Sequence, residues 1–309
     1  MSSRVTGPDF RAGLWRLADP KISLASFAGM WVAACFAAKD SALQWQWLAL
    51  TVAGVFFVEV AKNASGEIVD FDSGTDVGVR ESERSPFSGG KRVLIDGLLS
   101  REQTWGIAAT FYLLAIASGL VIAGLHDSRV LVFGIPGLAL AWYYHGGSVK
   151  LAYRGLGELA VAIAYGPLIV LGTYFVQTGQ LSAPLVHLSC ILGLLVAAFL
   201  WINEFPDYRA DKSAGKNNLV VRLGTRAATL GYVTMLATAY AWFALILLSS
   251  SGLSSAWPGL LGLPAALFSA HRLTHYSGDI TALVPAQASA LASLCLFAFG
   301  VGLGYLLLS

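Results

Sequence analysis

The sequence carries little charge. Asp, Glu, Lys and Arg make up 12% of its 309 residues, about half of the roughly 25% typical of soluble globular domains. The net charge of +2 gives no basic surface for nucleic acid, so we expect no nucleic-acid partner, and a soluble enzyme or a disordered chain is excluded as well. The three cysteines stand apart inside apolar stretches, a pattern typical of buried small hydrophobic residues rather than of disulfides or metal sites.

Long apolar runs dominate instead. Hydrophobic residues make up 56% of the chain, and the mean hydropathy is +0.66. A helix needs about 20 mostly apolar residues to cross a bilayer, and backbone in lipid must satisfy its own hydrogen bonds. We therefore predict an all-α, polytopic membrane protein with about nine transmembrane helices. The predicted spans lie near residues 22–38, 45–62, 104–124, 129–145, 157–177, 184–203, 226–249, 255–271 and 284–308.

Lys and Arg are concentrated in alternate connections between these spans. If the N-terminus lies in the cytoplasm, all of the 20 Lys and Arg residues except Lys39 and Arg129 lie on the cytoplasmic side. Because cytoplasmic loops are enriched in Lys and Arg, we predict a multi-pass protein of the cell membrane with its N-terminus inside and its C-terminus outside. Two inside segments, 62–103 and 203–226, are longer and more charged than the others, so chemistry is expected at the cytoplasmic face.

An amide followed by carboxylates appears after two of the spans. Asn203, Asp207 and Asp211 are spaced four residues apart, which puts them on one helical face. After the second span, the offsets place Asn63, Glu67 and Asp70 on one face, while Asp72 and Asp76 follow around the helix end. The segments 63–92 and 203–226 are thus both rich in acidic side chains.

Two converging acidic clusters require cations. Like charges 4 Å apart repel by about 4 kcal/mol at an effective dielectric of 20, and Mg²⁺ typically binds one or two carboxylates together with substrate phosphates. Basic residues interleaved with the acids suit the outer oxygens of a diphosphate. An acidic and basic site that faces an apolar bundle predicts a lipid diphosphate as substrate.

Simpler interpretations compete with this one. Either segment by itself could be a solvated loop whose charges keep it in water, although the repeated amide-then-carboxylate pattern weighs against that. The offsets of Asp70, Asp72, Asp76 and Glu81 partly imitate a calcium loop. Gly74 stands one place too early for that motif, and a second flanking helix is missing.

The chain resembles the UbiA superfamily of intramembrane aromatic prenyltransferases over most of its length. The second acidic segment looks like the family's second Asp-rich motif in full, through Asn203, Asp207, Asp211, Gly215 and the run 221–224.

The first motif is looser and allows two registers. Alignment on Gly74 and Asp76 places Asp70 and Asp76 on the family's two aspartates, whereas alignment on Asn63 places Glu67 on the first of them. The candidates in this motif are therefore Asn63, Glu67, Asp70, Asp72 and Asp76.

A third stretch indicates which aromatic compound, the acceptor, would receive the isoprenyl group. Residues 144–158, with 19–21 before the first span, are similar to the branch that prenylates 1,4-dihydroxy-2-naphthoate in menaquinone synthesis. The stretch 84–90 departs from that branch, which weakens the acceptor assignment more than the reaction assignment. Tyr153 and Glu158 are possible acceptor contacts, and a carboxylate at a helix start is the alternative explanation for Glu158.

The resemblance implies one domain over residues 1–309, with nine helices around a central cavity, cytoplasmic cap loops and a lateral opening to the bilayer. It implies that two Mg²⁺ ions bridge an isoprenyl diphosphate whose isoprenyl group passes to a lipophilic aromatic acceptor. The implied metal ligands are Glu67, Asp70, Asp72, Asp76, Asp207 and Asp211, with Asp70, Asp76, Asp207 and Asp211 as the catalytic set. The implied substrate contacts are Lys21, Asn63, Arg84, Lys91, Lys150, Tyr153, Arg154, Asn203, Lys216 and Arg222.

Two rival functions share parts of this pattern. A terpene cyclase of the same superfamily would ionise the diphosphate and let the substrate's own double bonds capture the cation. A transporter would also carry intramembrane acids, but it would place them near the midplane. Glu59 lies within the second span, where a lone charge costs roughly 2.5–3.5 kcal/mol if central, so we expect it to face the cavity or to be hydrogen-bonded.

Overall fold

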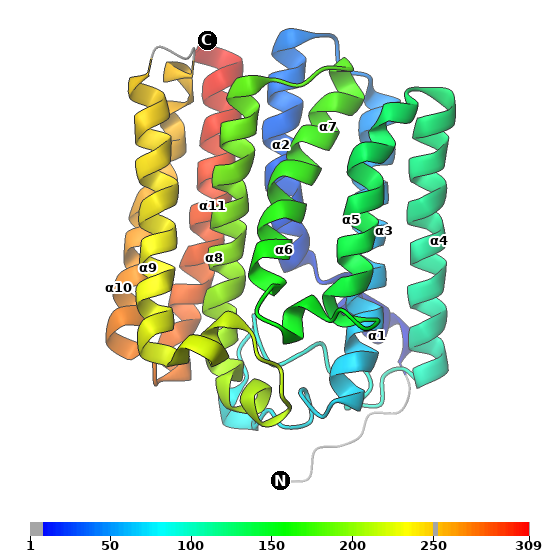
Figure 1. Ribbon diagram of the computed structural model, residues 1–309, viewed down its shortest axis with the longest axis vertical. Helices are drawn as coiled ribbons and strands as arrows, with labels where there is room; N and C mark the ends of the chain where they lie inside the picture. The colour runs from blue at the N-terminus through cyan, green and yellow to red at the C-terminus, as the bar shows by residue number, and fades with distance from the viewer. Residues whose placement is uncertain (1–8, 250–252, 309) are drawn as a thin grey trace.

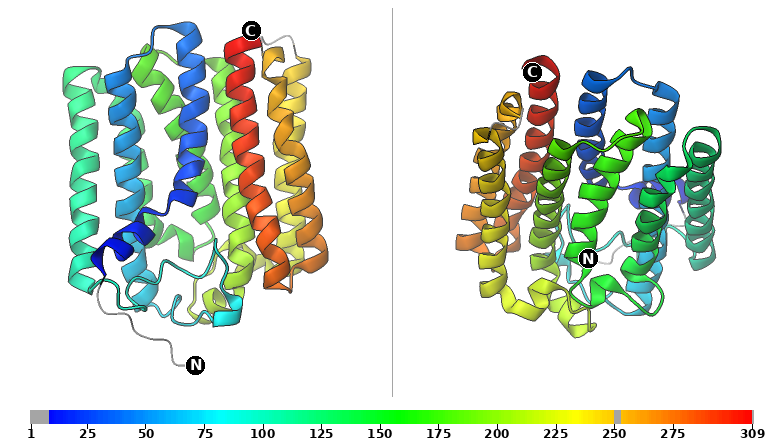
Figure 2. Two further views of the ribbon diagram at one scale, coloured as in Figure 1. Left: turned by 180° about the vertical axis from the view of Figure 1, so that it is seen from behind. Right: turned by 45° about the horizontal axis from the view of Figure 1, so that its top comes forward.

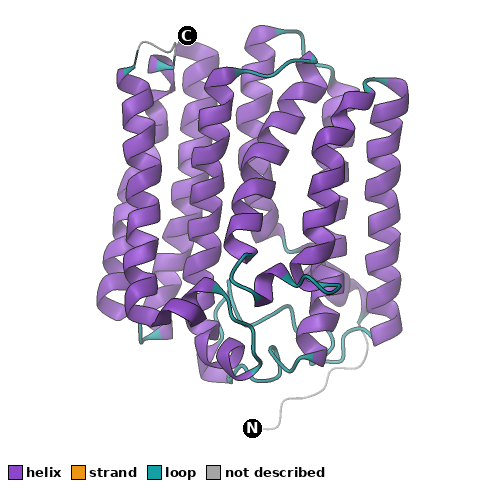
Figure 3. Ribbon diagram, in the orientation of Figure 1, coloured by secondary structure: helices purple, strands orange, loops and turns teal. Residues whose placement is uncertain are grey.

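The computed structural model describes residues 9–249 and 253–308, which form an all-helical bundle (Figures 1 and 3). Within these ranges the β-structure amounts to an isolated bridge between Ser85 and Ser88. The long helices run roughly antiparallel side by side, and the C-terminal end of α11 lies at one end of the bundle. The α-helices are α1 (Phe10–Ala18), α2 (Pro20–Asp40), α3 (Trp45–Asp72), α4 (Arg101–Leu125), α5 (Leu131–His145), α6 (Gly157–Ile163), α7 (Ile169–Thr178), α8 (Ala183–Ser213), α9 (Leu219–Leu248), α10 (Leu263–Tyr276) and α11 (Ile280–Leu308).

The prediction of an all-α, polytopic membrane protein is confirmed, and each predicted span overlaps a helix. By length and composition, 7 helical segments in the described ranges can cross a membrane. The other two predicted spans correspond to α5, with 15 residues, and α10, with 14, which are shorter than a full crossing. A short 3₁₀ segment precedes each of these two helices and lengthens it: η2 (Ser128–Val130) before α5 and η5 (Ser254–Gly262) before α10.

The helices that carry the two acidic segments continue beyond the predicted spans. α3 runs for 28 residues to Asp72 and α8 for 31 residues to Ser213. Gly74 and Gly215 follow these ends with φ of 78° and 74°, a left-handed conformation that glycine adopts without steric penalty. The first part of each acidic segment, up to Asp72 and up to Ser213, is therefore a helical extension of a membrane helix.

The fifth predicted span is broken by a π-helical turn, η4 (Ala164–Leu168), which contains Pro167 and separates α6 from α7. Proline lacks an amide hydrogen, so a local change of helical pitch accommodates it. Gly166 in this turn lies so close to Gly193 of α8 that an added Cβ would be 2.4 Å from the Ser189 carbonyl oxygen. Small residues here allow the two backbones to approach closely.

The main apolar core lies between α2, α8, α9, α10 and α11. Large apolar side chains such as Leu125, Leu230 and Leu248 are exposed on the outer surface, as expected where lipid surrounds the bundle. Segments 73–100, 146–156 and 214–218 lie together at the end opposite the C-terminal end of α11 (Figures 1 and 2). These connections cover the ends of α3 and α8.

Candidate active site

A cavity of about 480 Å³ lies beneath these connections. Its wall combines the inner face of the α8 end with the start of α2, the loop 84–92 and the link between α8 and α9. The cavity is lined by Asn203, Asp207 and Asp211. These three side chains therefore share one face of α8, as their spacing of four residues predicted.

The second acidic segment presents oxygens that lack donors. Asp207 accepts a hydrogen bond from the Gly89 amide at 3.1 Å, and Asp211 accepts one from Asn218 Nδ2 at 2.7 Å. The remaining side-chain oxygens are buried without a hydrogen-bond partner: Oδ1 of Asn203, Oε2 of Glu204, Oδ1 of Asp207 and Oδ1 of Asp211. Because buried acceptors are normally satisfied, a row of orphaned oxygens fits a bound cation.

The first acidic segment contributes Asp70 and Asp76 to the same region. Asp70 Oδ1 accepts a hydrogen bond of 2.6 Å from the Tyr153 hydroxyl, and its Oδ2 lies 3.6 Å from His145 Nε2. Asp76 is buried in the loop that follows. Burial, together with the negative charges of Asp70 and Glu67, raises the pKa of Asp76 to about 7. A positive charge bound nearby would favour the ionised form of this carboxylate.

Lys216 lies between the two acidic segments. Its Nζ is 3.4 Å from Asp70 Oδ2 and 3.9 Å from Asp211 Oδ1, and it lies 5.7 Å from the centre of the Tyr153 ring. Burial lowers the pKa of Lys216, but the carboxylates of Asp211 and Asp70 outweigh it and hold that pKa well above its usual value. The charged ammonium therefore neutralises part of both motifs.

Three predicted residues of the first segment are engaged elsewhere. Glu67 accepts hydrogen bonds from the backbone amides of Arg92 at 3.1 Å and Leu94 at 3.0 Å. Asn63 donates to the Leu17 carbonyl at 2.8 Å. Asp72 points away and pairs with Arg101 at an exposed position, with Nη2 2.7 Å from Oδ2. This arrangement favours the register in which Asp70 and Asp76 are the two motif aspartates.

The predicted basic residues divide into two groups. Lys21, Arg84, Lys91 and Lys216 line the cavity, where Lys21 donates to the Pro86 carbonyl and Lys91 pairs with Asp19. The others are outside its lining: Lys150 lies over the Tyr153 ring, Arg154 donates to the Ser148 carbonyl at 2.8 Å, and Arg222 donates to the Asn217 carbonyl at 2.9 Å. The cationic wall is therefore built mainly from the start of α2 and the loop 84–92.

Sequence reasoning missed several lining residues. Arg92 follows Lys91 directly, and its Nη1 donates to the Asp76 carbonyl at 3.3 Å. Glu204 and Asn218 also line the cavity. Their positions in the sequence, next to Asn203 and shortly after Gly215, could have identified them as candidates. Glu158 is buried and accepts the Leu219 amide at 2.7 Å, so it caps the start of α9 rather than its own helix.

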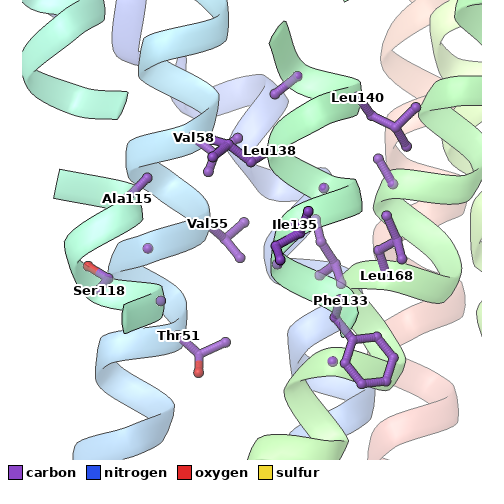
Figure 4. A pocket seen from close by; sticks show the side chains of 18 of the residues that line it. Thr51, Val55, Val58, Ala115, Ser118, Phe133, Ile135, Leu138, Leu140 and Leu168 are labelled. Atoms are coloured by element: carbon purple, nitrogen blue, oxygen red, sulfur yellow. The ribbon is translucent and has the colours of Figure 1, made fainter. Parts of the chain in front are cut away.

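A second, apolar cavity of about 360 Å³ adjoins the first, and Tyr144 lines both. It runs between α3, α4, α5 and the α6–α7 rod, where Val55 and Val58 of α3 face Ile135 and Leu138 of α5 (Figure 4). Leu120 and Ile135 in its wall are 58% and 61% exposed, so this cavity is open rather than sealed within the bundle.

No three Asp, Glu, His or Cys side chains within residues 9–249 and 253–308 converge closely enough to form a metal site by themselves. A cation in the first cavity would therefore also need oxygens from a bound substrate, which is the usual manner of Mg²⁺ binding beside phosphates.

The profile of the UbiA prenyltransferase family matches residues 26–284. The chain belongs to this family. The 1,4-dihydroxy-2-naphthoate octaprenyltransferase of Bacillus subtilis is 28% identical over 250 residues, which cover 79% of this chain and 76% of the relative. The 2-carboxy-1,4-naphthoquinone phytyltransferase of Synechocystis is 31% identical over 166 residues, or 53% of this chain and 50% of the relative. This UbiA-family chain is thus a multi-pass membrane prenyltransferase.

Solved structures of the family share its fold. A UbiA homolog from Archaeoglobus fulgidus bound to GPP and Mg²⁺ superposes with a TM-score of 0.67 at 16% identity and covers 94% of this chain and 99% of its own. A homolog from Aeropyrum pernix without ligand gives a TM-score of 0.65 at 20% identity, over 90% and 96% of the two chains. At these identities the likeness shows the fold alone.

Proposed function

We propose that the protein transfers an isoprenyl group from an isoprenyl diphosphate to a lipophilic aromatic acceptor within the membrane, in a Mg²⁺-dependent reaction, with 1,4-dihydroxy-2-naphthoate as the candidate acceptor. The observation that carries this proposal is the junction of the two cavities. One holds buried carboxylate and amide oxygens without donors beside basic side chains, and the other is lined mostly by apolar side chains of the membrane helices. An isoprenyl diphosphate likewise combines a charged diphosphate, which binds cations, with an apolar isoprenyl chain.

The residues present fit a divalent cation. Oxygens of Asp207, Asp211 and Asn203 face the cavity without donors. Asp70 and Asp76 lie outside the lining, but Asp70 contacts Lys216 and Asp76 lies against Gly90, and both of these partners line the cavity. When bound there, Mg²⁺ would act as a Lewis acid that neutralises charge on the departing diphosphate. Hard oxygen donors of this kind are its preferred ligands.

The chain's own groups account for the rest of the ionisation step. Lys21, Arg84 and Lys91 line the cavity and would hold the outer diphosphate oxygens. The Lys216 ammonium, which pairs with Asp70 and Asp211 in the structure, would also contact the phosphates. As the allylic C–O bond breaks, these cations stabilise the charge that develops on the leaving group. The Tyr144 ring, which lines both cavities, would shield the allylic cation through its π face.

The apolar cavity would hold the isoprenyl chain and admit a membrane-soluble acceptor. The naphthoate acceptor is supported by the relatives named above and by the similarity of residues 144–158 to that branch. We further propose that all of residues 1–309 form one domain whose site faces the cytoplasm with the C-terminus outside, which the distribution of Lys and Arg supports.

Product analysis by mass spectrometry tests this function. Purified protein, Mg²⁺ and a set of isoprenyl diphosphates would be incubated with and without 1,4-dihydroxy-2-naphthoate. We expect a prenylated, decarboxylated naphthol in the presence of acceptor, and we expect EDTA to prevent its formation. A cyclised terpene formed without acceptor would contradict the transferase proposal and favour a cyclase, and intact diphosphate in every reaction would contradict both.

A further inference from the structure

Glu59 is a buried carboxylate outside the acidic motifs. It lies on α3, about one turn before Asn63, in the wall of the apolar cavity. The side chain is only 5% exposed. Ser23 Oγ of α2 donates to Glu59 Oε2 at 2.8 Å. The hydroxyls of Ser26 and Tyr165 also interact with this carboxylate, although its buried Oε1 has no hydrogen-bond partner at full hydrogen-bond geometry.

Lys62 follows one turn later on the same face. Its Nζ lies 5.2 Å from the centre of the Tyr144 ring, and it also lines the apolar cavity. Because Tyr144 belongs to both cavities, Glu59 and Lys62 mark the point where the apolar cavity meets the diphosphate cavity. The carbon of an isoprenyl diphosphate that is attacked must lie at this junction, with its diphosphate on one side and its chain on the other.

A carboxylate oxygen that can accept a hydrogen bond and an ammonium group that can donate one thus line the same cavity, and they are the charged groups of a wall whose other polar side chains carry hydroxyls. The motifs do not account for either, since both lie outside the lining of the diphosphate cavity. A hydroxyl group satisfies a carboxylate oxygen that lacks a donor, and an ammonium pairs with a carboxylate. The two side chains together complement an aromatic ring that carries a hydroxyl and a carboxyl group.

We propose that Glu59 and Lys62 recognise the aromatic acceptor, with Glu59 accepting the hydrogen bond and then the proton of a ring hydroxyl and Lys62 binding the ring carboxylate. This inference rests on the proposed function and assigns acceptor recognition to residues outside both Asp-rich motifs. It identifies the acceptor class as hydroxylated aromatic acids.

The hydroxyl proton passes to Glu59 Oε1, and the electron pair left on oxygen drives a ring carbon onto C1 of the isoprenyl group while the C–O bond to diphosphate breaks. The new C–C bond leaves a ring ketone. When the attacked carbon carries the carboxylate, loss of CO₂ returns its electron pair to the ring, and the oxygen recovers its proton from Glu59.

Glu59→Gln tests the first half, because it keeps an oxygen for Ser23 and removes the proton acceptor. With geranyl diphosphate, Mg²⁺ and 1,4-dihydroxy-2-naphthoate, we expect kcat for transfer to fall at least about 100-fold, the range of a general base. Hydrolysis of geranyl diphosphate without acceptor should stay within about twofold of wild type. Glu102→Gln, the same exchange at an exposed position beside Ser100, is the matched control and should leave both rates unchanged.

Lys62→Met tests the second half even if the Glu59 variant fails to fold. We expect KM for 1,4-dihydroxy-2-naphthoate to rise about tenfold through loss of the charge-assisted contact, while KM for 1,4-dihydroxynaphthalene, which lacks the carboxylate, stays unchanged. Equal effects on both acceptors, or an effect on KM for geranyl diphosphate instead, would overturn the role of Lys62.

Equal loss of transfer and hydrolysis in the Glu59 variant, or loss of neither, would overturn the role of Glu59. The proposed function fails separately: a wild-type protein that hydrolyses geranyl diphosphate and prenylates no aromatic contradicts that function, whereas an active wild type with an equally active Glu59 variant contradicts only this inference.

Discussion

The ends of α3 and α8 carry similar acidic sequences but use them differently. At the end of α3, Glu67 holds two backbone amides of the loop 92–94 and Asp70 is held by Tyr153 and Lys216. At the end of α8, Asp207 and Asp211 each keep one buried oxygen without a hydrogen bond. Protein donors therefore already occupy Glu67 and Asp70 of the first segment, whereas the second segment retains buried oxygens that no protein donor occupies.

Substitution of Asp211 should have the largest effect. Asp211→Asn preserves the shape of the side chain but removes the charge of the unpartnered oxygen that faces Lys216. We expect turnover of the isoprenyl diphosphate to fall by about 10²–10³, as for other electrostatic stabilisers of a leaving group. Steady-state assays at saturating Mg²⁺ measure this, with the elution profile in detergent as the control for folding. Activity within twofold of wild type would contradict the cation role of the second segment.

Loss of Lys216 should make the protein depend on metal for stability. Lys216→Met leaves the carboxylates of Asp70 and Asp211 buried without their shared counter-ion, and breaking a buried pair costs about 3 kcal/mol or more. We expect a lower Tm in EDTA and a larger rise in Tm on addition of Mg²⁺ than in wild type, because the cation replaces the ammonium. An equal Mg²⁺ response in both proteins would contradict the view that ammonium and metal neutralise the same carboxylates.

Sequence periodicity was sufficient to predict the polar face at the end of α8, because the residues that form this face are close together in the sequence. Asn203, Asp207 and Asp211 share a face through a spacing of four on one unbroken helix. The apolar runs likewise predicted the spans, since crossing a bilayer dictates both length and composition. Hydropathy ended the second span near residue 62, yet α3 continues to Asp72 because its polar end is enclosed by protein, as the burial of Glu67 and Asp70 shows.

The α3 register could not be chosen from sequence because its deciding contacts are distant along the chain. Glu67 is fixed by the amides of Arg92 and Leu94, 25 and 27 residues away. Asp72 is turned outward by Arg101, which is 29 residues away. Spacing gives the positions of the carboxylates on α3, but it does not give these distant partners, which hold Glu67 and Asp72 in place.

Glu67→Gln should therefore act on stability more than on metal affinity. One of the two backbone amides would face an NH₂ group instead of an oxygen, which costs about 1–3 kcal/mol for a buried donor left unsatisfied. We expect a lower Tm with a Mg²⁺ concentration dependence of activity close to wild type. A large shift in that Mg²⁺ dependence, with Tm unchanged, would instead favour the register in which Glu67 is a metal ligand.

The smallest effect is expected at Asp72, the first-segment carboxylate that faces away from the cavity. Its pair with Arg101 is exposed, with side-chain exposures of 49% for Arg101 and 44% for Asp72, and exposed ion pairs contribute about 0–1 kcal/mol. Asp72→Asn should leave turnover, Mg²⁺ dependence and Tm almost unchanged, even though it lies two residues from Asp70. A loss of turnover as large as that of the Asp211 variant would mean that Asp72 turns inward when substrate binds, and the contrast between the two helix ends would then hold only for the free protein.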